Sequence, residues 1–317
     1  MSNFINIPEE IKNPDKFLRP LIQMAPKHEF LDLKITMQIE EKDIINKLSN
    51  HVANKKHDGL LTINAREALN LAFQDIITHK KQLISIITPS NSTYVSSCVT
   101  NEINKFCKWE FGPNKNADAY ILIHEFGRYV ELPKYLKNTK KPVIEDCAYA
   151  MTHKTMKNYY GRQGDYLVFS ISKALGLQYG GALILKNAKR KNMQSNISAS
   201  SKKYLVNYMG KNLKKLKKLN LERKKIYKIM QKLSKEYNLQ ESYICNNNEL
   251  CQGFLIKTKK NLDTEKIKRY MNDYGIESSI FYGGSAYFLP CHQRLTLFEI
   301  NYMFFHLSKA FKIFNKK

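Results

Sequence analysis

The most informative part of the 317-residue sequence consists of Val143-Ile-Glu-Asp-Cys-Ala-Tyr-Ala150 and Gly164-Asp-Tyr-Leu-Val-Phe-Ser-Ile-Ser-Lys-Ala-Leu-Gly-Leu-Gln-Tyr-Gly-Gly-Ala-Leu183. An acid, Asp146, ends the first short apolar run. A lysine, Lys173, follows the second run in a serine-rich turn, and a Gly-Gly pair comes seven residues later. Short continuous apolar runs of this kind are typical of strands that are buried on both faces of a parallel sheet.

Outward from this region, short apolar runs alternate with helical patterns. The sequence predicts strands at 83–88, 119–124, 142–146, 165–170 and 182–186, and a strand end or turn at 60–64. It predicts helices at 40–50, from 66 onward, at 94–106 and at 132–138. This alternation favours an α/β fold with a mostly parallel central sheet flanked by helices. Ligands of such sheets bind beyond the carboxyl ends of the strands, where Asp146 and the segments 88–94 and 124–127 lie.

The carboxyl-terminal third of the chain has a different pattern. A long helix fits residues 204–237, with apolar residues on one face and lysines on the other. Behind it we expect a strand at 252–258, a helix at 264–274, a strand at 275–282 and a helix at 296–314. We therefore predict a large α/β domain at 1–205 and, at 206–317, a linking helix with a small α+β domain.

The composition excludes several classes of protein. Hydrophobic residues make up 43% and charged residues 25%, which is typical of a globular chain. No apolar run approaches the length of a membrane span, and the first residues do not resemble a secretory signal. The six cysteines form no CxxC pair, so we expect reduced thiols and neither a disulfide framework nor a metal site. The expected location is the cytoplasm.

The formal net charge is +24, from 52 Lys and Arg against 28 Asp and Glu. One interpretation is a solvated lysine-rich surface, and the other is a polyanionic partner, either nucleic acid or a phosphorylated small molecule. The solvated surface is favoured because no aromatic residues are interleaved with the basic ones. Nucleic acid is therefore not an expected partner.

Several segments, taken in order along the chain, resemble the motifs of the sugar aminotransferase family named DegT/DnrJ/EryC1/StrS. They are Asn64-Ala-Arg-Glu-Ala-Leu69, Thr93-Tyr-Val-Ser-Ser97, His124-Glu-Phe-Gly127, Glu145-Asp-Cys-Ala-Tyr-Ala150, Ser170-Ile-Ser-Lys173 and Leu289-Pro-Cys-His-Gln-Arg-Leu-Thr296. The resemblance covers residues 30–317 and is densest from 60 to 186. It implies the PLP-transferase fold type I, with pyridoxal 5'-phosphate (PLP) as the cofactor.

The resemblance also implies roles for individual residues. Lys173 would carry the cofactor aldehyde and move a proton between cofactor and substrate, and Asp146 would pair with the pyridine nitrogen. Five further positions would bind the cofactor. Tyr94 would stack on the ring, and Tyr149 would contact the ring hydroxyl. Ser170 would bind the phosphate, together with the backbone N–H groups of Ala65 and Arg66 at a helix start. His124, Cys147 and His292 are expected to be structural.

This sequence departs from the family pattern at three places. Tyr149 stands where Gln or His is usual, Ala65-Arg66 replaces Gly-Thr, and only two residues separate Ser170 from Lys173. The asparagine that family members lend to the neighbouring subunit's phosphate is not identifiable.

The favoured hypothesis is a homodimeric aminotransferase that moves an amino group from an amino acid, glutamate being the expected donor, to a nucleotide-linked keto sugar for surface polysaccharide or glycoconjugate synthesis. Two alternatives are a PLP-dependent sugar dehydratase and a non-catalytic divergent family member that acts as a binding protein. Lys173 argues against the dehydratase, in which histidine replaces the lysine.

Overall fold

The computed structural model describes residues 21–26, 39–52, 57–151, 160–186 and 193–315. By its contacts the chain divides into two compact units. The large unit comprises 28–220 and 247–250, and the small unit comprises 1–27, 221–246 and 251–317. The predicted boundary at 205/206 lies within helix α5 (Ala199–Asn212), whereas the contacts divide the chain within helix α6 (Leu216–Glu236), which is common to both units.

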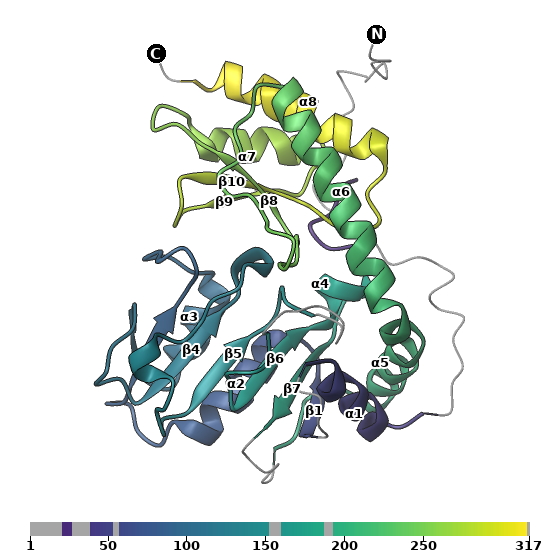
Figure 1. Ribbon diagram of the computed structural model, residues 1–317. Helices are drawn as coiled ribbons and strands as arrows, with labels where there is room; N and C mark the ends of the chain where they lie inside the picture. Colours follow the sequence, from purple (N-terminus) through teal and green to yellow (C-terminus); the bar gives the residue numbers. More distant parts are fainter. Residues whose placement is uncertain (1–20, 27–38, 53–56, 152–159, 187–192, 316–317) are drawn as a thin grey trace. The chain divides into compact units, whose positions relative to one another are not determined.

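The large unit is built on a seven-stranded sheet in the order β1-β7-β6-β5-β4-β2-β3 (Figure 1). The strands are β1 (Asp58–Thr62), β2 (Leu83–Ile87), β3 (Lys108–Phe111), β4 (Ala119–Ile123), β5 (Val143–Asp146), β6 (Tyr166–Ser170) and β7 (Gly181–Leu185). Strand β7 pairs antiparallel with both of its neighbours, and the other pairs are parallel. The mostly parallel central sheet predicted from the sequence is thus confirmed.

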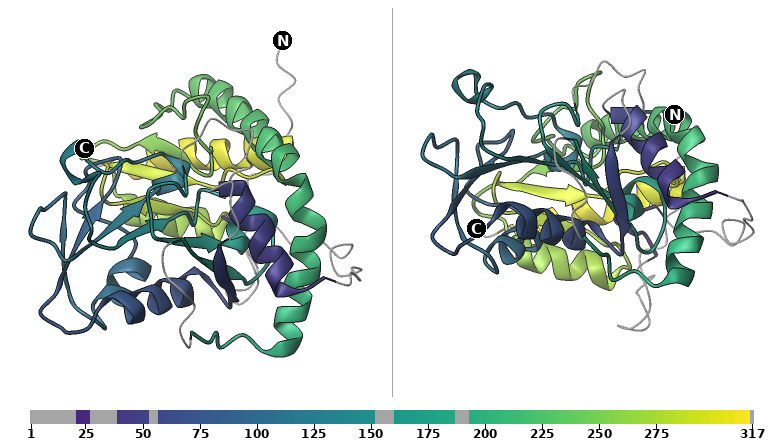
Figure 2. Two further views of the ribbon diagram at one scale, coloured as in Figure 1. Left: turned by 60° about the horizontal axis from the view of Figure 1, so that its bottom comes forward. Right: turned by 90° about the horizontal axis from the view of Figure 1, so that it is seen from below.

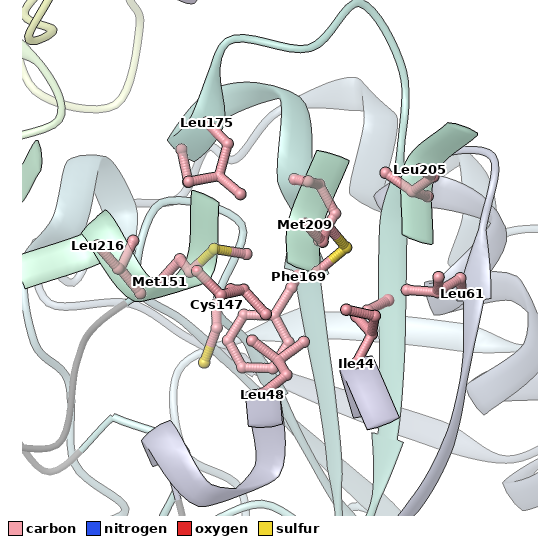
Figure 3. Close-up of a cluster of buried hydrophobic side chains, with 14 of the residues drawn as sticks. Ile44, Leu48, Leu61, Cys147, Met151, Phe169, Leu175, Leu205, Met209 and Leu216 are labelled. Atoms are coloured by element: carbon pink, nitrogen blue, oxygen red, sulfur yellow. The ribbon is translucent and has the colours of Figure 1, made fainter. Parts of the chain in front are cut away.

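Helices cover both faces of this sheet. Helices α2 (Ala65–Ile76) and α3 (Ser97–Ile103) pack on one face, where their core includes Val168 of β6. Helices α1 (Glu41–Val52) and α5 lie side by side on the other face, against Phe169 of the same strand (Figures 1 and 2). Figure 3 shows Phe169 between Leu48 of α1 and Met209 of α5. Alternate residues of a strand point to opposite faces, so one apolar run serves two cores.

Three predicted helices differ in extent. The helix predicted at 94–106 begins only at Ser97, because the Ser96 hydroxyl caps it by accepting from the Cys98 N–H. The helix predicted at 132–138 is a single 3₁₀ turn, η3 (Lys134–Leu136). The long helix predicted at 204–237 is divided into α5 and α6 by another 3₁₀ turn, η4 (Leu213–Lys215).

The small unit contains a three-stranded antiparallel sheet in the order β8-β10-β9. Its strands are β8 (Phe254–Lys257), β9 (Ser279–Phe281) and β10 (Ala286–Leu289), and helices α7 (Thr264–Asp273) and α8 (Leu297–Ile313) pack with them around a shared core. This agrees with the predicted α+β character, although the central strand β10 was not among the predicted strands. None of the helices in the described parts of the chain combines the length and apolar character that a membrane span requires.

Candidate functional site

The sheet brings most of the predicted site residues to one edge. Strands β1, β5 and β6 run in the same direction, so their carboxyl ends share an edge. Asp146 ends β5, Ser170 ends β6 with Lys173 one turn later, and Ala65 begins the helix that follows β1. Residues that are far apart in the sequence are therefore neighbours in the sheet.

Asp146 is a buried acid with one hydrogen bond to its side chain. Asp146 is only 6% exposed, and its Oδ1 accepts a hydrogen bond from the Ala148 N–H at 2.9 Å. Within the described residues, Oδ2 has no hydrogen-bond partner. Burial raises the pKa of Asp146, against the opposing effects of the Ala148 N–H and the charges of Lys173 and His124. A buried carboxylate with an open oxygen suits a cationic N–H donor.

Lys173 lies in helix α4 (Ile171–Leu175), which begins directly after β6, and its side chain is half-buried. Its Nζ lies 3.7 Å from the centroid of the Tyr149 ring, so the ring face attracts the ammonium group. The Tyr149 ring in turn lies 5.8 Å from that of Phe126. No carboxylate of the described residues is within ion-pair distance of Lys173. The amine is held by an aromatic face and is available for chemistry.

The start of helix α2 offers donors for an anion. Asn64 caps the helix and accepts from the Glu67 N–H at 3.0 Å, whereas the N–H groups of Ala65 and Arg66 have no partner among the described residues. Gly181 lies beside this turn, and a Cβ there would come within 2.4 Å of the Asn64 carbonyl carbon. In the sheet register Gly181 also faces Ser170, so Ser170 is near the helix start.

The Glu67 carboxylate near this helix start is occupied by other hydrogen-bond donors. It accepts from the N–H groups of Ile63 at 2.7 Å and Asn196 at 2.5 Å. The Ser195 hydroxyl donates to it at 3.1 Å. The two open N–H groups and the positive end of the helix dipole remain as the features that favour an anion.

The predicted role of Tyr94 is to stack on the cofactor ring. Tyr94 lies in the loop between β2 and α3, where its N–H donates to the Ser92 hydroxyl at 2.9 Å. Tyr94 is 37% exposed. That Tyr94 stacks on a cofactor ring stays a prediction.

The sequence reasoning missed a buried network beside Asp146. Glu145 is fully buried and accepts from His124 Nε2 at 2.9 Å and from the N–H groups of Gly161, Gln163 and Gly164 at 2.6, 3.1 and 2.9 Å. Burial acts to raise the pKa of Glu145, but these hydrogen bonds and the His124 charge hold it below its usual value. The His124 N–H also donates to the Asp146 carbonyl at 3.2 Å. The network thus fixes the backbone that carries Asp146.

His124, Glu145 and Cys147 place three possible metal ligands within 4.8 Å of one another. The Val130 N–H donates to His124 Nδ1 at 3.3 Å, which leaves Nε2 as the protonated nitrogen that donates to Glu145. A protonated Nε2 has no lone pair for a metal ion. His124 is thus hydrogen-bonded on both ring nitrogens, and its structural role stays a prediction.

A second buried acid, Glu125, also escaped notice. Its Oε2 accepts from the Ser90 hydroxyl at 2.7 Å, and its Oε1 is buried without a partner among the described residues. Burial raises the pKa of Glu125, against the hydrogen bond from Ser90 and the charge of Arg128. The neighbouring Phe126 has φ = 52°, a left-handed conformation that is unusual for a bulky residue.

Comparison with known proteins places this geometry in context. No protein-family model matches the sequence, and no curated protein matches it. Solved structures do match its fold. The aminotransferase TlmJ from Streptoalloteichus hindustanus has a TM-score of 0.71 at 13% identity, over 92% of this chain and 99% of that chain. The PMP-form of Spr1654 from Streptococcus pneumoniae has a TM-score of 0.69 at 12% identity, over 92% of this chain and 99% of that chain.

A DegT DnrJ EryC1 StrS aminotransferase from Brucella abortus is also similar, with a TM-score of 0.62 at 12% identity, over 88% of this chain and 92% of that chain. Structural matches at identities this low show the fold alone. The chain therefore has the fold of the PLP-dependent sugar aminotransferases, as the resemblance in its sequence predicted.

Proposed function

We propose that this protein is a PLP-dependent aminotransferase that acts on a keto sugar. The observation that carries the proposal is the placement of Lys173 and Asp146. They lie at the ends of adjacent strands at one edge of the sheet, and the buried residue Asp146 has one carboxylate oxygen that the described residues leave without a donor. The fold and the ordered sequence motifs support the same conclusion.

The residues present fit the cofactor at each of its functional groups. The open oxygen of Asp146 would accept from a protonated ring nitrogen, and the Lys173 amine would hold the aldehyde. The open N–H groups of Ala65 and Arg66, with Ser170, would hold the phosphate. PLP, when bound, supplies an electron sink that makes a substrate C–H bond acidic.

The remaining chemistry belongs to the protein. The Lys173 Nζ would take and return the substrate proton, which requires an amine that is held in place and partly shielded from water. Tyr149 contacts this amine directly. We assign Tyr149 to holding Lys173 as well as to the predicted contact with the ring hydroxyl, because its aromatic face already lies against Nζ. Burial of Asp146 strengthens its attraction to a ring cation.

The finer details rest on the family resemblance. The amino donor would be glutamate, and the acceptor a nucleotide-linked keto sugar whose phosphates suit the chain's excess of basic residues. The enzyme would act as a cytoplasmic homodimer in surface polysaccharide or glycoconjugate synthesis. We keep the assignment of two domains, at 1–205 and 206–317, as part of this proposal.

The test is a visible absorption titration of the purified protein with PLP, followed by glutamate. We expect the band of lysine-bound PLP, and its conversion to the pyridoxamine form on addition of glutamate. The Lys173→Ala variant should lack the band. Lys186→Ala is a matched control, because Lys186 is another partly buried lysine that follows a strand, but its position after β7 is at the opposite edge of the sheet.

Two results would contradict the proposal. If Lys173→Ala kept the band and Lys186→Ala lost it, Lys173 would not be the attachment site. If the folded wild-type protein bound no PLP, the departures at Ala65, Arg66 and Tyr149 would favour the alternative of a non-catalytic binding protein. A stable band that glutamate does not convert would contradict glutamate as the donor.

A further inference from the structure

Two cysteines of the small unit lie side by side. The Sγ atoms of Cys245 and Cys251 are 2.6 Å apart, and all six cysteines of the chain are present as thiols. A disulfide requires sulfurs about 2.05 Å apart, so bond formation would need the two atoms to approach by about 0.5 Å. Five residues separate the two cysteines in the sequence.

The surroundings of the pair suit thiol–disulfide chemistry. Cys245 is half-exposed, whereas Cys251 is 5% exposed. The backbone at Cys245 is fixed because its N–H donates to the Tyr227 hydroxyl at 2.9 Å, which in turn donates to the Tyr243 carbonyl at 3.1 Å. The buried Arg223 guanidinium interacts electrostatically with Cys291 and with Cys251.

The other cysteines differ from this pair. Cys291 interacts electrostatically with Cys251 and Arg223, but it is buried and burial raises its pKa. Burial raises the pKa of Cys107 and Cys147, which makes them poor nucleophiles. Cys98 is exposed, but no other sulfur of the described residues lies beside it. It therefore serves as a matched control for simple exposure.

We propose that Cys245 and Cys251 form a reversible disulfide by exchange with a small-molecule disulfide such as glutathione disulfide. The Cys245 thiol loses a proton, and its sulfur attacks one sulfur of the oxidant, breaking that S–S bond and releasing one thiol. The Cys251 sulfur, also deprotonated, then attacks Cys245 Sγ and releases the second thiol. The protein loses two hydrogens and two electrons, and the oxidant is reduced to two thiols.

The disulfide would close a loop that is hydrogen-bonded to residues beside the candidate site. Within the large unit, the Leu250 N–H donates to the Gly127 carbonyl at 3.2 Å, and the Tyr129 N–H donates to Glu249 Oε1 at 3.1 Å. A Cβ at Gly127 would lie 1.8 Å from the Leu250 carbonyl oxygen, so this docking is close. A covalently closed ring from Cys245 to Cys251 allows its residues Glu249 and Leu250 fewer open conformations, so the disulfide would reduce the opening of this loop.

The experiment incubates the full-length protein with glutathione disulfide and then counts thiols in denaturant and maps the linked peptides. We expect the thiol count to fall from six to four, with Cys245 joined to Cys251. The Cys98→Ser variant should form the same bond, with its count falling from five to three. Cys251→Ser should accumulate a stable glutathione adduct at Cys245, because the attacking partner is missing.

Hydrogen exchange supplies a second readout that does not depend on cofactor or activity. Oxidation should slow exchange of the Leu250 amide several-fold and leave the Leu136 amide in η3 unchanged. The proposal is overturned if wild-type protein keeps six thiols, if it retains a glutathione adduct at Cys245 without forming the bond, or if oxidation joins two chains through Cys98. Unchanged or faster exchange of Leu250 in the oxidised protein would overturn the locking of the loop.

Discussion

Replacing Glu145 by glutamine should destabilise the protein strongly, although the two side chains have nearly the same shape. In the wild type the carboxylate accepts four hydrogen bonds, two at each oxygen. A glutamine amide can satisfy the donors at one oxygen only, and its NH₂ group then faces two N–H donors. With about 1.5–3 kcal/mol for each hydrogen bond to a charged group, the loss is about 3–6 kcal/mol.

The assay is urea unfolding of the cofactor-free protein, with Glu131→Gln as the control. Glu131 pairs with Lys137 at 3.3 Å, and both side chains are half-exposed. An exposed pair of this kind contributes at most about 1 kcal/mol. If Glu145→Gln lost no more unfolding free energy than Glu131→Gln, the argument that this network fixes the strand end would be refuted.

The pH dependence of stability tests the role of Glu145 in a second way. The pKa of Glu145 is held below its ordinary value of 4.5, so the folded state binds its proton less readily than the unfolded state does. Its stabilising contribution is therefore complete above that value and is lost as the pH falls through the folded pKa. The difference in unfolding free energy between wild type and Glu145→Gln should shrink on acidification, and a constant difference would contradict the assignment.

Three further predictions concern the site and the cysteine pair. Asp146→Asn should stabilise the cofactor-free protein at neutral pH and abolish turnover. Because the pKa of Asp146 is raised in the folded state, its contribution to stability falls as the pH rises towards that pKa, by at most about 1.4 kcal/mol per pH unit. Unfolding curves of wild type and variant, measured at several pH values, would show the difference. Tyr149→Ala should remove a contact with Lys173 of about 0.5–2 kcal/mol and slow PLP attachment. Tyr149→Phe keeps the ring face and loses only the hydroxyl, so it should slow attachment less than Tyr149→Ala does in stopped-flow absorption measurements. Closing the seven-residue loop between Cys245 and Cys251 should raise the unfolding free energy by about 2 kcal/mol, measured by urea unfolding with and without reductant, and an oxidised form less stable than the reduced one would indicate strain.

Much of the large unit could be predicted because its strands are buried on both faces. Continuous apolar runs such as Leu-Val-Phe in β6 are distinctive in any sequence. Strand β3 was missed because it is short, partly exposed and contains Lys108 and Glu110, so it lacks that signal. The antiparallel direction of β7 depends on the turn around Gly176 and Gly180, both with positive φ, and apolar content does not encode direction.

The candidate site was predictable only in part, for a similar reason. Chain order and the parallel arrangement were enough to bring Asp146 and Lys173 to one edge. The contact between Tyr149 and Lys173 depends on loop conformation, including the left-handed Phe126 that places its ring near Tyr149. The hydrogen bond between the His124 and Glu145 side chains joins two strand ends. No spacing rule in a single sequence indicates such a pair.

The central claim is that Lys173 holds PLP, and borohydride reduction tests it most directly. Reduction fixes PLP to the amine that carries it, and peptide mapping then identifies that lysine among the many in this basic chain. At one equivalent of PLP, we predict that the label lies on the peptide containing Lys173 and that Asp146→Asn keeps the same site. A label distributed over surface lysines, or concentrated on Lys186, would contradict the account.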